Sequence, residues 1–197
     1  MPLFQNAVLN KFLSGMDEKK VEEAWERFTA HFHNAEIQEN IRNSKEEEYQ
    51  EGFLNDLFVK VLGYTKNPTP NFNLKVEQKN LNDSKKADGA LLDGRKVRGV
   101  IELKGTETTD LGKVEGQAFG YKNKQPDALY VIISNFEKLR FYIDNAVDFL
   151  EFNLFTLTKE EFKVLWLCLG YPNFMKGLPK KIKDASLTEE ENVTKKL

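Results

Sequence analysis

The sequence has little of the chemistry that cross-links small domains or binds zinc. Of its 197 residues, one is cysteine and two are histidine. The single cysteine, Cys168, excludes an internal disulfide and a cysteine-based zinc site, and its apolar neighbours predict a core position. His31 and His33 lie two residues apart, so a helix would direct them to different faces. They are therefore poor joint ligands for a metal.

Long apolar runs are also lacking. No stretch approaches the length needed to span a bilayer, and no basic region followed by an apolar segment opens the chain. We therefore expect a cytoplasmic protein without a signal peptide and without a membrane partner. The hydrophobic content of 40% suits one domain of ordinary size, or one domain with an appended helical part.

The chain lacks a strong net charge, which is −2, so global charge gives no nucleic-acid signal. The distribution says more. Between Asp17 and Glu51 the sequence holds eleven acidic and five basic residues, whereas between Lys75 and Gln125 it holds eleven basic and eight acidic residues. The second region has the local basic excess that a phosphate-binding surface requires, although an ordinary mixed surface is the alternative.

A hairpin is predicted within the basic region. Two apolar runs, Ala90–Leu92 and Val97–Leu103, flank Asp93-Gly94, and Asp-Gly between strand-like runs is a strong turn signal. Asp88 lies where the first strand begins. Glu102 and Lys104 lie at the end of the second strand, two residues apart and therefore on one face of the sheet.

Folding this hairpin would bring Asp88, Glu102 and Lys104 into one neighbourhood. Two carboxylates and a lysine beside apolar strands are unfavourable unless they are paired or bind a metal. Carboxylate oxygens suit Mg²⁺, and a nearby lysine can hold or deprotonate a water. Taken singly, Asp88 could equally be a turn residue, and the other two could lie on an exposed strand edge.

These residues resemble the signature of the PD-(D/E)xK nucleases: an aspartate, a variable gap, then Glu-x-Lys after a hydrophobic strand. Here the gap runs from Gly89 to Ile101, and Ala87 replaces the proline that often precedes the aspartate. The resemblance implies that Asp88 and Glu102 hold Mg²⁺, or alternatively Mn²⁺, with help from the Leu103 backbone carbonyl. It also implies that Lys104 orients or activates the attacking water.

A second element follows in the order that this superfamily shows. Gln117 and Tyr121 form a Gln-x-x-x-Tyr element, as in the branch that includes RecB-like and type I restriction nucleases, and on a helix they share one face. The resemblance implies that they position the scissile phosphate or Lys104. Apolar runs at 128–134 and 138–143 predict two more strands, and alternation in the second half of 146–157 favours another.

The resemblance also implies a glutamate from an opening helix. Ser44 and Glu47 match a capping box, which predicts that a helix begins there and ends before Gly63. In the family a glutamate near the start of this helix completes the acidic cluster. The apolar stripe favours Glu46 or Glu47, and Glu48 and Glu51 remain alternatives; we take Glu47 as the metal-binding candidate.

The expected fold is α/β in the α+β sense: a restriction-endonuclease-like core with a mixed sheet of four to five strands, flanked by helices. Apolar spacing between Leu3 and Asn34 predicts an N-terminal helical layer. We expect this layer to occupy residues 1–43 and the nuclease core residues 44–170.

The charged segment 171–197 resembles the helix that leads from nuclease to methyltransferase in type IIG restriction-modification enzymes. The expected partners are therefore double-stranded DNA and covalently fused methyltransferase and target-recognition parts in the full-length protein. A stand-alone nuclease of similar sequence is the alternative.

Three functions remain open at this level. The first is an Mg²⁺-dependent DNA endonuclease domain of a type IIG-like restriction-modification enzyme. The second is a catalytically silent domain of the same fold that binds DNA or a protein partner. The third, a helical interaction module, fits residues 1–34 but not the β core. The sequence predicts no DNA target, because it contains no zinc pattern and no clear helix-turn-helix.

Overall fold

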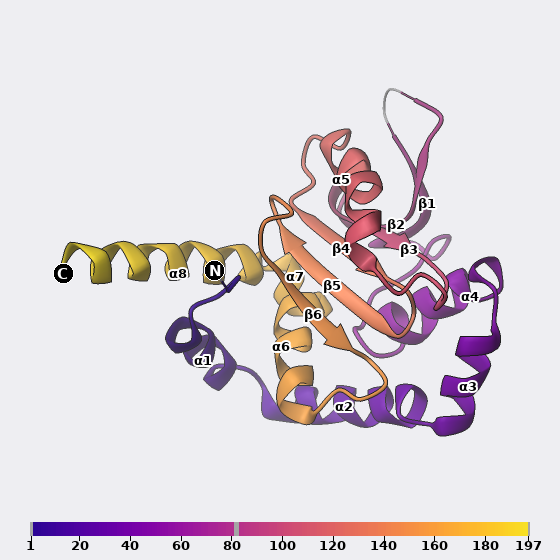
Figure 1. The fold of residues 1–197 in the computed structure, drawn as a ribbon, viewed down its shortest axis with the longest axis horizontal. Helices are drawn as coiled ribbons and strands as arrows, with labels where there is room; N and C mark the ends of the chain where they lie inside the picture. Colours follow the sequence, from indigo (N-terminus) through magenta and orange to yellow (C-terminus); the bar gives the residue numbers. More distant parts are fainter. Residues whose placement is uncertain (1, 81–82, 197) are drawn as a thin grey trace.

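The computed structural model describes residues 2–80 and 83–196, which form a mixed sheet with helices on both faces (Figure 1). Strands that are neighbours in the sequence are neighbours in the sheet. β3 and β4 run parallel, and the other neighbouring pairs are antiparallel. The strands are β1 (Leu74–Lys79), β2 (Lys86–Asp93), β3 (Lys96–Leu103), β4 (Tyr130–Ser134), β5 (Lys138–Ile143) and β6 (Phe149–Asn153).

The expected mixed sheet is present, but its strand count of four to five was too low, because the sheet has six strands. The final strand also lies earlier than the alternation in the second half of 146–157 indicated. Phe149 pairs with Tyr142 and Asn153 pairs with Lys138, so β6 lies across the middle of that segment. Pairing with β5, rather than local alternation, determines where this strand lies.

The predicted hairpin is formed by β2 and β3, with its turn one residue later than expected. Asp93 pairs with Lys96, which leaves Gly94 and Arg95 as a two-residue loop. Gly94 has φ +60°, and a positive φ at the first loop position is the reason why glycine suits this kind of turn.

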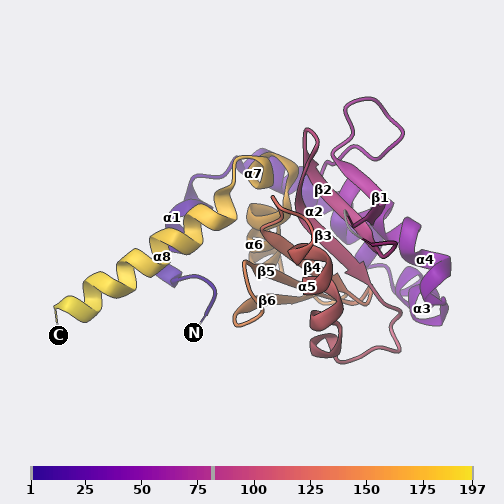
Figure 2. The same cartoon turned by 90° about the horizontal axis from the view of Figure 1, so that it is seen from above.

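The helices form two groups around the sheet. α5 (Glu115–Asn123) covers one face. The opposite face is covered by α4 (Glu46–Phe53), by the π-helical turn that continues it, and by the helices near the two ends of the chain (Figures 1 and 2). The helices are α1 (Asn6–Ser14), α2 (Glu18–Phe32), α3 (Ala35–Asn43), α4 (Glu46–Phe53), the π-helical η1 (Leu54–Val59), the 3₁₀ turn η2 (Leu111–Val114), α5 (Glu115–Asn123), α6 (Lys159–Leu169), α7 (Tyr171–Met175) and α8 (Leu178–Lys195).

Two of these helices differ from the prediction. α3 was not predicted, since its only fully buried residue is Ile41 and its apolar stripe is short. α4 begins one residue later than the Ser44–Glu47 box implied. The Lys45 backbone N–H donates to Glu48 Oε2 at 2.7 Å, so the carboxylate that caps the helix start is Glu48.

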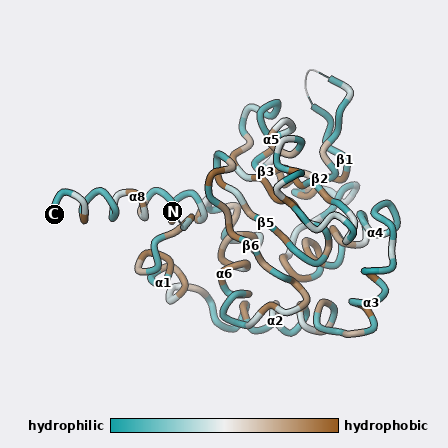
Figure 3. The backbone as a smooth tube through the Cα atoms, viewed as in Figure 1, coloured by the Kyte–Doolittle hydropathy of each residue, from teal (hydrophilic) through white to brown (hydrophobic). Residues whose placement is uncertain are grey.

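The apolar residues form two clusters, one on each face of the sheet. The larger cluster joins α2, α4, η1 and α6 to the sheet, and the smaller one packs α5 on β2, β3 and β4. Figure 3 shows hydrophobic segments along the strands and α6. Among the described residues, no helix combines the length and the apolar character needed to cross a bilayer.

α8 continues well beyond the rest of the molecule (Figures 1 and 2). Its first half is anchored: Ile182 is fully buried, and the Gln5 backbone N–H donates to Ser186 Oγ at 3.0 Å. Its outer half is largely hydrophilic (Figure 3), although Leu187 and Val193 are exposed.

Candidate active site

The β2–β3 hairpin places two carboxylates side by side. Gly89 pairs with Ile101, and continuing this antiparallel register by one residue puts Asp88 opposite Glu102. Asp88 Oδ2 accepts a hydrogen bond of 2.7 Å from the Leu103 backbone N–H, which fixes the aspartate against β3. Lys104 follows directly, with its backbone N–H bound to the Ser134 carbonyl of the neighbouring segment.

Glu102 is an acidic side chain with almost no solvent contact, since it is only 2% exposed. Its Oε1 accepts a hydrogen bond from Lys104 Nζ at 3.2 Å. Its Oε2 is buried and has no hydrogen-bond partner within the described residues. Burial, followed by the charge of Asp88, raises the pKa of Glu102 from 4.5 to about 7, although Lys104 acts in the opposite direction.

The neighbours of Glu102 respond to the same environment. Burial raises the pKa of Asp88, and the hydrogen bond from Leu103 opposes this. Burial lowers the pKa of Lys104, but the charges of Glu102 and Glu46 outweigh it, so the net shift is upward. The lysine is therefore a cation held between acidic groups, and it compensates part of their mutual repulsion.

The helix glutamate next to this cluster is Glu46, not the candidate Glu47. Glu46 Oε1 lies 3.8 Å from Lys104 Nζ, whereas Glu47 is exposed. The other two alternatives are used elsewhere: Glu48 caps its own helix, and Glu51 pairs with Lys66 at 2.6 Å. The later start of α4 explains this register, because it turns Glu46 towards the end of β3.

Gln117 and Tyr121 lie on α5, which packs on the same strands. Tyr121 is 9% exposed and belongs to the smaller core cluster, so it faces the sheet. Gln117 is exposed, and its amide donates to the Tyr121 hydroxyl at 3.1 Å. The two side chains thus contact each other, while Lys104 hydrogen-bonds to Glu102 instead.

The donor set can be tested for its fit to a hard cation. Within the described residues, no group of three or more acidic, histidine or cysteine side chains is arranged ready to hold a metal. Lys104 instead lies between Glu102 and Glu46. Glu102 Oε2, which has no hydrogen-bond partner among the described residues, and the adjacent Asp88 carboxylate are nevertheless oxygen donors of the kind that a divalent cation prefers. These residues therefore fit a divalent cation, whose charge would take over part of the compensation of acidic repulsion that Lys104 provides.

Sequence reasoning missed one acidic residue beside the cluster. Val76 pairs with Gly89 and Gln78 with Ala87, so Glu77 lies opposite Asp88 across β1 and β2. Glu77 has the unusual φ of +56°, and its Oε2 pairs with Lys86 Nζ at 3.0 Å. Its charge contributes to the raised pKa of Asp88. Counting the register back from the β1–β2 connection was the signal that could have found it.

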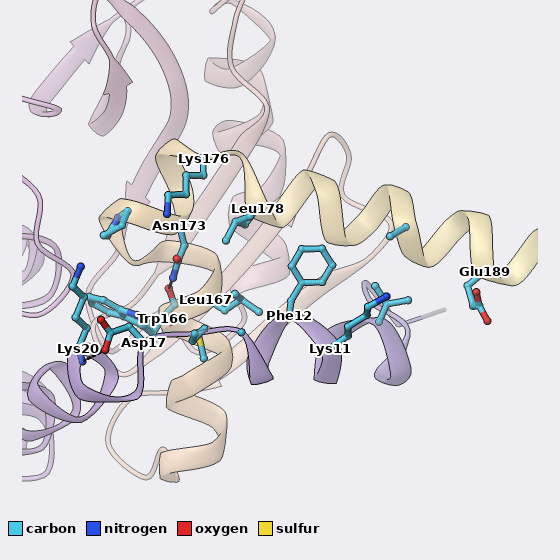
Figure 4. Close-up of a pocket in the computed structure, with 15 residues that line it drawn as sticks. Lys11, Phe12, Asp17, Lys20, Trp166, Leu167, Asn173, Lys176, Leu178 and Glu189 are labelled. Atoms are coloured by element: carbon cyan, nitrogen blue, oxygen red, sulfur yellow. Dashed lines mark hydrogen bonds between the residues drawn. The ribbon is translucent and has the colours of Figure 1, made fainter.

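A pocket of about 880 Å³ lies elsewhere, between α1, α6, α7 and α8 (Figure 4). Phe12, Trp166 and Leu178 line it together with the lysines Lys11 and Lys176. It shares no residue with the strands of the hairpin or with α4. It is therefore separate from the carboxylate cluster.

Comparison with known proteins gives one result. Neither the curated proteins nor the solved structures contain a match to the chain. A family model described as MmeI, N-terminal domain, matches residues 17–191, which include every side chain of the carboxylate cluster. Because this match spans most of the sequence, the chain belongs to the MmeI N-terminal domain family.

Proposed function

We propose that this chain is the Mg²⁺-dependent DNA endonuclease domain of a type IIG restriction-modification enzyme. Membership in the MmeI N-terminal domain family supports an N-terminal domain of such an enzyme. The observation that carries the nuclease part is Glu102: a buried carboxylate, opposite Asp88, with one oxygen lacking any partner among the described residues. Most buried polar atoms in proteins have a hydrogen-bond partner, so this unpaired oxygen supports a site that takes an incoming cation.

The residues take the following roles in this proposal. Asp88 and Glu102 would hold the cation, with the Leu103 carbonyl and Glu46 as further oxygen donors. A bound Mg²⁺, or Mn²⁺ in its place, would neutralise charge on the phosphate and lower the pKa of a bound water. Lys104 would hold that water beside Glu102, and Gln117 with Tyr121 would position the phosphate.

The expected substrate is double-stranded DNA. In the full-length protein, methyltransferase and target-recognition parts fused to this domain would supply sequence recognition. Such an enzyme would act in the cytoplasm, where its DNA substrate lies.

Plasmid cleavage tests the proposal. The full-length enzyme should nick or cut supercoiled plasmid with Mg²⁺ and lose this activity with chelator. Asp88→Ala, Glu102→Ala and Lys104→Ala should each abolish cleavage, with Glu47→Ala as the matched control because Glu47 is exposed. Cleavage that survives Asp88→Ala or Glu102→Ala would show that the chemistry lies elsewhere.

One observation favours a second function, a catalytically silent domain that binds DNA or a protein partner. Lys104 already contacts both Glu102 and Glu46, so the acidic cluster is compensated without a metal. Titration calorimetry with Mn²⁺ separates the two readings. The nuclease proposal requires a binding isotherm that disappears in Asp88→Ala, whereas a silent domain gives none at this site.

A further inference from the structure

Two glycines in α5 are required neither by a close contact with the described residues nor by a positive φ. Gly116 and Gly120 lie one turn apart on the exposed side of the helix, and a Cβ atom built on either meets nothing within 4 Å. Glycine stabilises a helix less than alanine does, because it loses more backbone freedom on folding. The two glycines therefore make the helix less stable, although alanine would fit at both positions. This favours a role in which another molecule approaches the helix backbone closely.

The same face of α5 is basic. Lys113 in η2, Gln117 in α5 and Lys124 at the C-cap of α5 are exposed, and they recur at helical spacing with the two glycines between them. The acidic residue of this helix, Glu115, is directed away: its Oε1 accepts hydrogen bonds from Arg140 and from the Tyr142 hydroxyl, at 3.2 and 2.8 Å. The exposed face thus offers cations and amide groups without a competing carboxylate from the helix.

A pocket of about 370 Å³ borders this face where α5 meets the β1–β2 hairpin. Lys124 Nζ lies 2.5 Å from Asp83 Oδ2, while Lys85 forms no ion pair with any described residue. Asn80 is the independent sign of a ligand here. It lines the pocket and is 7% exposed, yet its Oδ1 lacks a hydrogen-bond donor in the part of the chain that the structure describes. An incoming group, or a water that it carries, would satisfy this oxygen.

α5 packs on the two strands that carry Asp88 and Glu102. α5 lies over β2, β3 and β4 (Figure 1), and Tyr121 packs in the same core cluster as Ala87 and Val100 from the first two of these strands. Ala87 precedes Asp88, and Val100 lies two residues before Glu102. A DNA strand that runs along α5 would therefore lead towards the proposed site of cleavage.

We propose that the exposed face of α5, from Lys113 to Lys124, holds the sugar-phosphate backbone of duplex DNA, with Gly116 and Gly120 allowing the close approach. Lys85 and Lys113 would contact phosphates, as phosphate contacts from lysine commonly position DNA without reading its sequence. The inference rests on the proposed function and adds the surface on which the substrate lies.

Replacing both glycines should raise the thermal stability of the chain and lower its affinity for DNA. In the double variant Gly116→Ala/Gly120→Ala, the helix should gain stability, because the added methyl groups have free space, and the thermal midpoint should rise. Affinity for a short fluorescent DNA duplex, measured by anisotropy at low salt without divalent metal, should fall several-fold. If the two glycines only supported the fold, the thermal midpoint and the affinity for DNA would change in the same direction.

The lysines give a second, independent measurement. Lys113→Gln and Lys85→Gln should each reduce the slope of log affinity against log salt by about one. Matched controls lie far from α5: Gly15→Ala, whose added Cβ has ordinary contacts, and Lys20→Gln beside the pocket of Figure 4. Neither control should change DNA affinity.

The outcomes separate this inference from the proposed function. Unchanged DNA affinity in the double glycine variant overturns the inference, even where Asp88→Ala abolishes cleavage. The inference is also overturned if the parent chain binds no DNA duplex at low salt. It is likewise overturned if the double variant changes only self-association in sedimentation, because the face would then be a protein contact. Weakened binding in a chain without cleavage supports the inference and counts against the nuclease.

Discussion

At the scale of single residues, the buried position of Glu102 makes the ionised site unstable on its own. Its pKa rises from 4.5 in a free side chain to about 7 in the folded chain. Between pH 4.5 and about pH 7, the folded state therefore keeps a proton that the unfolded state has already lost. By linkage, stability from this group is present below about pH 4.5 and falls as pH rises to about 7.

Glu102→Gln should remove this penalty. The amide keeps the shape of the side chain and stays neutral, so the variant should be more stable than the parent chain by about 3 kcal/mol at pH 8. At pH 5, where the parent glutamate is largely protonated, the difference should be small. Urea denaturation at the two pH values measures this. A variant that is less stable at pH 8 would show that the ion pair with Lys104 outweighs the burial of the charge.

Metal binding should release a proton from the same site. At pH 6 part of the Glu102 population is protonated, and a cation would displace that proton, whereas at pH 8.5 the site is already ionised. Calorimetry with Mn²⁺ in buffers of different ionisation enthalpy should therefore show release of a fraction of one proton at pH 6 and almost none at pH 8.5. Proton release that is independent of pH would contradict this assignment.

At the scale of elements, α4 carries Glu46 and is held in place by a small polar network. The Tyr49 hydroxyl donates to Asp56 Oδ2 at 2.9 Å and lies 2.9 Å from His31 Nε2, which ties α4 to η1 and α2. The Tyr49 ring also packs on Phe136, in the turn that follows β4. These contacts hold Tyr49, one turn after Glu46 in α4, against η1, α2 and the turn after β4.

Tyr49→Phe isolates the contribution of the hydroxyl. The ring contacts remain, while Asp56 loses a hydrogen bond in a partly buried setting, so we expect the free energy of unfolding to fall by about 1–2 kcal/mol. Chemical denaturation measures this. Tyr171→Phe is the matched control, since Tyr171 is 37% exposed and should tolerate the change. Equal effects at the two positions would mean that the network around Asp56 contributes little.

The elements that could be predicted from the sequence are those specified by local patterns. Alternation and Asp-Gly predict the hairpin that joins Asp88 to Glu102, and helical spacing predicts that Gln117 and Tyr121 share a face. The rest depends on tertiary contacts. Lys45 replaces Ser44 as the first cap because Glu48 accepts its backbone N–H, and this shift brings Glu46 to the site. The sixth strand needs β5 as its partner, so its own alternation misplaces it.

At the scale of the whole molecule, the described ends of the chain meet on α8. Gln5 Nε2 donates to Glu190 Oε1 at 2.8 Å, in addition to the backbone contact of Gln5 with Ser186. Ile182 and Pro179 are buried against the body, whereas most residues after Ser186 are exposed. The first half of α8 thus belongs to the folded unit, and the second half projects from it.

Truncations should separate the two halves. Deleting residues 188–197 should lower the free energy of unfolding by less than about 1 kcal/mol, because it removes mostly solvated side chains. Deleting residues 180–197 removes buried Ile182 and the Ser186 contact, and it should cost several kcal/mol or prevent folding. Thermal unfolding followed by circular dichroism measures both. A large loss from the shorter deletion would show that the projecting half packs on the body.

The order of the strands has a consequence for the speed of assembly. Each strand pairs with its sequence neighbour, so the sheet can form through comparatively short loop closures. The packing of α2 on α6 instead joins segments more than a hundred residues apart, and both tryptophans, Trp25 and Trp166, lie in these two helices. In stopped-flow refolding, tryptophan fluorescence should therefore lag behind the circular dichroism signal, because it reports the closing of the helical layer over a sheet that already exists.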